Sequence, residues 1–239
     1  DMGVWSAVLW SVSVEFVFYL LFPFLLRFLQ RWGVRYLLAL LALLNLLRLL
    51  AAATNPEQVR DLSYWTIVGR LDQFVLGMLG AWVLRRGWVR WGRRLWLGFA
   101  ALALVGQACA LWWFNRHGSF FGNGRWRAVW PLVEGSLWAA VVVAWVAALQ
   151  GVSGRGWRWL AMPGLVSYSV YLLHFPVVAA VKTRHWGNSV GEAALLTFGV
   201  VVPIVAVVAT LAYFVVERPF MEMRVRYLSD RDAAATAST

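Results

Sequence analysis

The sequence has 239 residues, of which 62% are hydrophobic and only 14% are charged. Because a water-soluble domain averages about 45–50% apolar and about 25% charged residues, this composition excludes a soluble globular protein, a disordered chain and a collagen-like chain. The net charge is +11, but its basic residues punctuate apolar stretches, which indicates membrane topology and no binding of nucleic acid.

Seven apolar stretches are long enough to cross a bilayer, for which a helix needs roughly 20 mostly apolar residues. In chain order they are Leu9–Leu29, Val34–Ala53, Tyr64–Leu84, Leu95–Phe114, Trp130–Leu149, Pro163–Val181 and Ala193–Val216. Many of the 17 tryptophans lie near the ends of these stretches, where interfacial indole rings are favoured. The pattern predicts an all-α, polytopic membrane bundle of about seven transmembrane helices in the lipid bilayer. Residues 1–228 form one predicted domain, and residues 229–239 are predicted to be a disordered tail.

The basic residues between the predicted spans are distributed unevenly. The loops after the first, third and fifth spans and the C-terminal segment hold about twice as many Lys and Arg as the opposite loops, to which we assign Arg48. The positive-inside rule therefore predicts a cytoplasmic C-terminus. Seven spans then place the N-terminus outside. Since the chain starts with Asp1 and has no signal peptide, we expect an odd number of further spans upstream, with a true outside start as the alternative.

Ionisable residues within the predicted spans are functional candidates, because a charge at a span centre costs at least about 2.5–3.5 kcal/mol. They are Glu15, Arg70, Asp72, His174 and, nearer a span end, Glu134. Counting residues from each span end places four of these side chains in the outer half of the membrane: Glu15, Arg70, His174 and Glu134. They would form one polar cluster if their helices are neighbours.

Helical spacing predicts how some of these side chains are oriented. Ser11 and Glu15 are four residues apart and share one helix face. Arg70 and Asp72 are two residues apart and cannot face each other, so each needs its own partner; we expect Arg70 to pair with Glu15.

The span that contains His174 has its own pattern. Ser167, Tyr171 and His174 share one face of this span. Pro176 cannot donate a hydrogen bond to the Leu172 carbonyl and is expected to kink the helix beside His174.

Each candidate also has a structural interpretation. Glu15 and Arg70 could form an ion pair that fixes helix packing, and His174 could be a hydrogen-bonded packing residue. Asp72 could be a hydrogen-bond acceptor on a helix contact face, and Glu134 could extend to the interface. The three histidines and single cysteine show no metal-binding spacing, so no metal site is predicted.

Several motifs occur in the order that a known family shows. The segment Trp10–Pro23 resembles the W-S-L-S-x-E-x-x-F-Y-L-L-F-P signature of the bacterial membrane acyltransferase 3 family. Ser167–Pro176 is similar to its S-Y-x-x-Y-L-x-H-x-P segment, and Glu217–Phe220 to its closing E-R-P-F motif. Arg70–Met78 also resembles a family segment, less distinctively. The resemblance covers nearly the whole chain.

This resemblance implies a multi-pass enzyme of the inner (plasma) membrane. It would move an acyl group, usually acetyl, from acyl-CoA to a hydroxyl of a cell-envelope glycan or lipid-linked saccharide on the outer side. Acyl-CoA (acetyl-CoA) is the donor co-substrate, and no bound cofactor is implied. The family's first span carries a His regarded as the catalytic base, which is not found upstream of Trp10. This chain is therefore expected to be a fragment that holds the supporting part of the site and to be inactive alone.

From the motifs and the intramembrane charges we assign candidate roles. The catalytic candidates are Glu15, Arg70 and His174; the candidates for binding substrate are Ser11, Ser13, Tyr19, Asp72, Tyr168 and Tyr171. A secondary transporter or flippase is the alternative function, although the internal repeat typical of transporters is absent from the sequence. A non-catalytic membrane scaffold is a third hypothesis.

Overall fold

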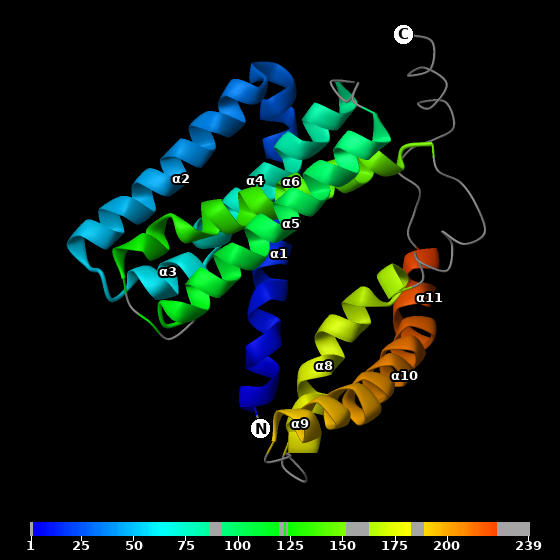
Figure 1. Ribbon diagram of the computed structural model, residues 1–239. Coiled ribbons are helices and arrows are strands. Elements are labelled where there is room, and N and C mark those ends of the chain that lie inside the picture. Colours follow the sequence, from blue (N-terminus) through cyan, green and yellow to red (C-terminus); the bar gives the residue numbers. More distant parts are fainter. Residues whose placement is uncertain are drawn as a thin grey trace. The chain divides into compact units, whose positions relative to one another are not determined.

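The computed structural model describes residues 2–86, 92–119, 122, 124–151, 163–182 and 189–223, with side chains from residue 9 onward. The predicted tail at 229–239 lies outside these residues. The described elements are all helices, as Figure 1 shows. The chain divides into two compact units, which are considered separately below. Residues 10–152 form the N-terminal unit, and residues 1–9 with 153–239 form the C-terminal unit.

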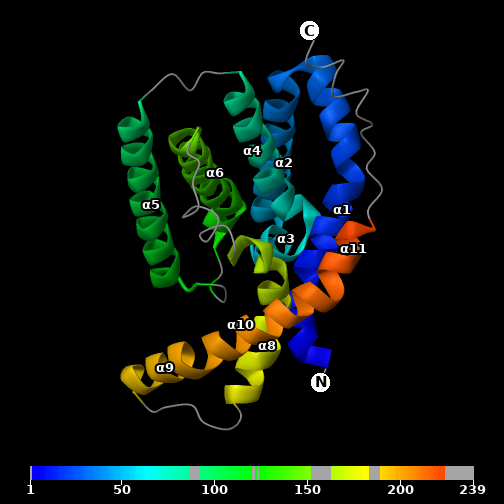
Figure 2. The same cartoon turned by 90° about the vertical axis from the view of Figure 1, so that its right-hand side faces the viewer.

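The N-terminal unit is an antiparallel helical bundle. Its elements are α1 (Met2–Trp32, from residue 10 onward), α2 (Val34–Thr54), α3 (Val59–Trp65), α4 (Ile67–Arg85), α5 (Arg93–Arg116), the 3₁₀ turn η1 (Arg125–Ala128) and α6 (Trp130–Leu149). Helix α6 packs against both α5 and α4, and α4 packs against α2, so these four helices lie in one row (Figure 2).

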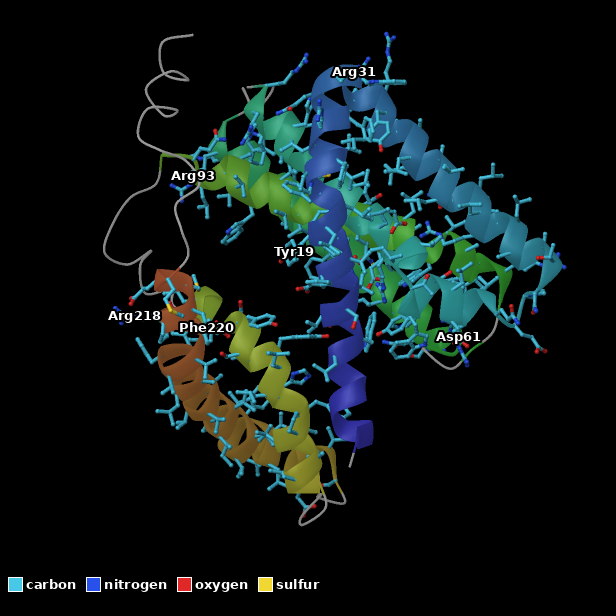
Figure 3. All side chains as sticks on the ribbon, turned by 180° about the vertical axis from the view of Figure 1, so that it is seen from behind. Tyr19, Arg31, Asp61, Arg93, Arg218 and Phe220 are labelled. Carbon is cyan, nitrogen blue, oxygen red and sulfur yellow. The ribbon has the colours of Figure 1, made fainter. Side chains whose placement is uncertain are left out.

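Successive connections of this unit lie at opposite ends of the bundle. The turn between α1 and α2, which Gly33 makes with a φ of 72°, is at the same end as the end of α4 and the start of α5 (Figure 2). The short elements α3 and η1 are at the other end. Arg31 and Asp61 mark these two ends in Figure 3. Of the basic residues assigned to the cytoplasmic loops between the first five spans, those that the structure describes therefore gather at the Arg31 end, as the predicted topology requires.

Apolar and small side chains hold the N-terminal unit together. One buried cluster joins three helices, from Phe18 on α1 through Leu37 on α2 to Val75 on α4. The Phe18 and Phe74 rings stack with centroids 4.0 Å apart. A second cluster joins Trp96 on α5 to alanines on α6, where small residues let the two helices approach closely. Most of the remaining large apolar side chains are exposed, as expected for a surface that faces lipid.

The C-terminal unit contains α8 (Ser167–Lys182), which runs beside a long helical segment, Val190–Glu222 (Figure 1). That segment comprises α9 (Val190–Leu196), η2 (Thr197–Val201), α10 (Val202–Ala212), η3 (Tyr213–Glu217) and α11 (Arg218–Glu222).

Two π-helical turns interrupt the long segment, and each comes just before a proline. The turn η2 precedes Pro203, and η3 precedes Pro219. A proline cannot donate to the carbonyl four residues earlier and its ring crowds that carbonyl, so the helix widens locally instead of ending. The two turns are therefore explained by the sequence, although the periodicity of the segment alone did not predict them.

The prediction of a polytopic helical membrane protein is confirmed. Within the described residues, six helices are long and apolar enough to cross a membrane: Leu9–Trp32, Val34–Thr54, Ile67–Arg85, Arg93–Arg116, Trp130–Leu149 and Val190–Glu222. The remaining predicted span, Pro163–Val181, which is the sixth in chain order, is shorter than expected, because its main helix, α8, has 16 residues. At 1.5 Å per residue α8 is about 24 Å long, less than the roughly 30 Å hydrocarbon core.

The start of the third predicted span was wrong. The stretch from Tyr64 is not one helix, because Thr66 is extended (φ −111°, ψ 158°) and separates α3 from α4. The Thr66 hydroxyl accepts a hydrogen bond from the Gly69 amide at 3.2 Å and so caps α4. The membrane helix therefore begins at Ile67, and α3 is a separate short helix.

Candidate functional site

Arg70 is the centre of a polar and aromatic cluster in the N-terminal unit. Its position one turn into α4 brings it back against the end of α3, where its Nε donates to the Tyr64 carbonyl at 3.2 Å. The guanidinium carbon lies 4.4 Å from the centroid of the Tyr64 ring and 5.7 Å from that of the Trp10 ring. Two aromatic faces and a carbonyl therefore hold this cation within a membrane helix.

The carboxylate next to Arg70 belongs to Glu134 of α6. Arg70 Nη1 lies 3.6 Å from Glu134 Oε2, and the two side chains are 14% and 23% exposed. The expected pairing of Arg70 with Glu15 was therefore wrong: among the described residues, Glu134 provides the acidic partner. Packing of α6 against α4 decided this, and the sequence does not show which spans are neighbours. Glu15 lies partly buried on α1.

Asp72 has a separate partner, as predicted, and that partner is Arg48. Arg48 Nη2 donates to Asp72 Oδ2 at 2.7 Å, and both side chains are 0% exposed. Arg48 also donates to the Gly69 carbonyl at 3.1 Å and to the Asn45 side chain at 3.0 Å. Asp72 Oδ1 accepts from the Gln73 amide at 2.9 Å. This network joins α2 to the first turns of α4.

Two expectations about these residues change. Arg48 was assigned to a loop, but it is fully buried within α2. Of the two interpretations of Asp72, the geometry favours the acceptor on a helix contact face, because a fully buried, paired carboxylate presents no free oxygen to a substrate. Arg48 interrupts an apolar run just as Arg70 does, so the same signal would have identified it.

Gly69 lets α3 and α4 approach each other closely beside this network. A Cβ built at Gly69 would lie 2.3 Å from the Leu62 carbonyl oxygen and 2.4 Å from that of Ser63. These are backbone atoms, which cannot move aside as the end of a flexible side chain can. Gly69 therefore fixes the position of Arg70, the next residue, relative to α3.

His174 lies on α8 of the C-terminal unit, partly exposed. Its Nδ1 is 2.6 Å from the Tyr171 carbonyl oxygen. A carbonyl can only accept a hydrogen bond, so Nδ1 carries the hydrogen and, in the neutral ring, Nε2 keeps a lone pair. Pro176 lies inside the helix, two residues further on. The kink expected there stays a prediction.

A hydrogen bond joins α8 to the end of the long C-terminal segment. The buried Ser169 hydroxyl donates to Glu217 Oε1 at 2.5 Å across 48 residues of sequence. Glu217 closes the π turn η3. In the sequence, Glu217 stood out only as part of a motif and had no predicted partner. The proline two residues after it was the available signal that this stretch has a special geometry.

The other candidates for binding substrate occupy mostly open positions. Ser13 is exposed and Ser11 is partly exposed on α1, and Tyr19 is 65% exposed near the middle of that helix (Figure 3). On α8, Tyr168 and Tyr171 are 44% and 37% exposed.

The ionisable candidates belong to both units. Glu15, Arg70, Asp72 and Glu134 lie in the N-terminal unit, and His174 lies in the C-terminal unit. The single polar cluster expected from their depths stays a prediction.

An apolar groove of about 320 Å³ lies between α4 and α6, one helical turn from the Arg70 cluster. Its lining includes Gly80, Gly135 and Trp138, with the Gln73 side chain as a polar group. The described residues contain no group of three or more His, Cys, Asp or Glu side chains that could hold a metal ion.

Comparison with known proteins identifies the family. A family model described as an acyltransferase domain matches residues 2–216, which is most of the chain. The chain belongs to this acyltransferase family. No curated protein and no solved structure matches the sequence.

The match extends over the elements described above. All of the candidate catalytic and substrate-binding residues of this acyltransferase lie within residues 2–216, as do Arg48 and Glu134. Glu217 is the first residue beyond the match. The resemblance seen in the sequence motifs is therefore confirmed at the level of the family, and the protein is a membrane acyltransferase.

Proposed function

We propose that this acyltransferase moves an acyl group, usually acetyl, from acyl-CoA on the cytoplasmic side to a hydroxyl of a cell-envelope glycan or lipid-linked saccharide on the outer side of the inner membrane. The observation that supports this proposal most is the family match across helices that carry charged and polar side chains. A thioester on one side and an acceptor on the other need a polar route through the bilayer, which such residues can line.

The proposed reaction exchanges a thioester for an ester. The acceptor oxygen forms a bond to the acyl carbonyl carbon, the bond from that carbon to the CoA sulfur breaks, and the hydroxyl proton leaves to a base and ends on the CoA thiol. The base raises the nucleophilicity of the hydroxyl, and hydrogen-bond donors stabilise the negative charge that develops on the carbonyl oxygen.

We assign His174 to the acyl or acceptor path, where it would orient the acceptor hydroxyl; the base itself is the His that the resemblance implies on an earlier span. The Nδ1 hydrogen of His174 is engaged by the Tyr171 carbonyl, which fixes the ring and leaves Nε2 to accept a hydrogen bond from the hydroxyl. Tyr171 and Tyr168 are exposed beside it and offer phenol groups to the acyl or acceptor path.

We assign to Arg70 the stabilisation of the negative charge that develops on the acyl carbonyl oxygen. Glu15 would hold a catalytic group in position. Arg70 Nε and Nη1 face Tyr64 and Glu134, so its position is held before any substrate arrives, as electrostatic stabilisation requires. On α1, Ser11, Ser13 and Tyr19 extend the polar positions on either side of Glu15.

Acyl transfer can be measured directly. The full-length protein, purified and reconstituted into proteoliposomes with radiolabelled acetyl-CoA and membrane glycans, is expected to label the glycan fraction. His174→Gln should lower kcat by about 100-fold if Nε2 orients the acceptor hydroxyl. His117→Gln, at an exposed histidine after α5, is the matched control and should retain full activity.

Two results would contradict the proposal. One is a folded protein that labels no acceptor pool. The other is flux of a saccharide across the proteoliposome membrane without acyl-CoA, which would favour the transporter alternative. Retention of activity in His174→Gln would remove His174 from the mechanism while leaving the acyl transfer itself in place.

A further inference from the structure

A small basic pocket lies at the Asp61 end of the N-terminal unit, where α3, η1 and α6 meet. Its lining includes three arginines, Ser63 and two aromatic residues: Arg60, Arg70, Arg127, Ser63, Phe114 and Trp130. The family match names no ligand for these residues. The pocket has a volume of about 20 Å³, enough to hold the oxygen atom of one ligand.

The charges around the pocket do not balance. Arg60 Nε is 2.9 Å from Asp61 Oδ1, and Arg70 faces Glu134. Arg127 has no such neighbour: among the described residues, no carboxylate forms an ion pair with it. The pocket therefore has one uncompensated positive charge.

Arg127 is unusually buried for a cation without a counter-ion. Its side chain is 5% exposed and lies against the Trp126 and Phe114 rings, with its guanidinium carbon 4.7 and 5.5 Å from their centroids. Nη2 donates to the Ser119 carbonyl, but Nε is buried without a hydrogen-bond partner. Burial, and secondarily the charge of Arg60, lowers the pKa of Arg127. A negative ligand would relieve both effects.

Ser63 gives a second, independent indication of a ligand. Its side chain is 6% exposed and its hydroxyl is buried without a hydrogen-bond partner. A serine in a helix can satisfy its hydroxyl on a carbonyl of the preceding turn, and this one does not. Two residues that line this small space, Arg127 and Ser63, thus each have a buried donor without a partner.

The surroundings of the pocket indicate where the ligand comes from. Trp113, Trp126 and Trp130 cluster beside it, with ring centroids 4.9 to 6.1 Å apart. Tryptophan is favoured at the level of the lipid headgroups, where phosphates are the main anions. A phosphodiester has a single negative charge, which matches the single unbalanced arginine.

We propose that this pocket binds one phosphate oxygen of a membrane phospholipid, with Arg127 and Ser63 as the donors. The other phosphate oxygens remain outside the pocket, near the more exposed guanidinium of Arg60. The bound lipid would fix η1 against α3 next to Arg70. Binding needs no acyl donor, so this inference is independent of acyl transfer.

Thermal unfolding of the full-length protein in detergent tests the proposal, with tryptophan fluorescence as the signal. The protein is titrated with phosphatidylglycerol, with a diacylglycerol of the same acyl chains, and with inorganic phosphate at constant ionic strength. Phosphatidylglycerol should raise the unfolding midpoint in a saturable way, because a ligand of the folded state stabilises it by mass action. Diacylglycerol, which lacks the phosphate, should not.

Variants separate a phosphate site from general charge attraction. Ser63→Ala should leave the midpoint without lipid unchanged or raise it, since it removes an unpaired buried hydroxyl, yet weaken phosphatidylglycerol binding roughly ten-fold. Arg127→Gln should weaken binding more. Arg125→Gln, an exposed arginine two residues away in the same turn, is the matched control and should bind as the wild type does.

The proposal would be overturned if Ser63→Ala bound phosphatidylglycerol as tightly as the wild type, a result that holds even if Arg127→Gln fails to fold. Equal stabilisation by diacylglycerol would also overturn it, because the effect would then come from the acyl chains. Stabilisation by inorganic phosphate but not by the phospholipid would assign the site to a soluble phosphate and overturn the assignment to a lipid.

Discussion

Removing the Asp72 carboxylate tests whether this residue holds the bundle together or binds substrate. In Asp72→Ala, Arg48 would keep only the Gly69 carbonyl and the Asn45 amide oxygen as acceptors, at 3.1 and 3.0 Å. A fully buried guanidinium would then have no counter-ion. Breaking a buried ion pair in this way costs about 3–5 kcal/mol, so a large loss of stability is expected.

A double variant removes both charges of the buried ion pair between Arg48 and Asp72. The double variant Arg48→Met, Asp72→Leu replaces two buried charges by apolar side chains of similar size, which is often neutral or stabilising. We therefore expect the double variant to recover most of the stability that Asp72→Ala loses. The coupling between the two sites, read from a double-mutant cycle, should be several kcal/mol.

Thermal unfolding in detergent measures stability, and the acetyl-transfer assay measures activity at a temperature where each variant is folded. If Asp72 is structural, the double variant has near wild-type stability and retains acetyl transfer. A double variant that is stable but inactive would refute this reasoning and return Asp72 to the substrate-binding residues. The exposed pair Arg60 and Asp61 is the control, since exposed ion pairs contribute about 0–1 kcal/mol.

Two further substitutions test the local geometry. Gly69→Ala places a Cβ against backbone carbonyls of α3 and should destabilise the protein by about 3 kcal/mol in thermal unfolding. Gly77→Ala is the control in the same helix: a Cβ there has no atom within 4 Å, so this variant should be neutral or stabilising. Ser169→Ala removes the donor to Glu217 and should lower the free energy of unfolding by about 2 kcal/mol. The control is Ser167→Ala, whose exposed hydroxyl bonds to the Gly164 carbonyl. Equal losses in the two serine variants would show that the link between α8 and η3 is not stabilising.

The fold class and the positions of the spans followed from composition and apolar length. A stretch of about 20 apolar residues that crosses a bilayer forms a helix, because the hydrocarbon core holds no water and the backbone groups must bond to one another. The exact ends of the helices did not follow from composition and apolar length. Thr66 breaks the third stretch through its own side-chain hydrogen bond, and α8 is shorter than the apolar stretch that contains it.

The candidate site was predictable in residue type but not in pairing. An intramembrane charge needs a partner, and the spacing of Arg70 and Asp72 on one helix requires a separate partner for each. That spacing does not identify the partners, since Arg48 and Glu134 come from helices whose neighbours only packing reveals. The same limit applies to Ser63 and Arg127, whose side chains look ordinary in the sequence and become informative only through burial without partners.

The sequence by itself determined that this chain is a helical membrane protein of the acyltransferase family, because hydrophobic length and motif order are properties of the linear chain. The tertiary structure decided which charges meet. In the N-terminal unit, close packing of α4 against α2 and α6 selects Arg48 for Asp72 and Glu134 for Arg70. That choice depends on which helix faces touch, and an apolar stretch in lipid does not specify its neighbours.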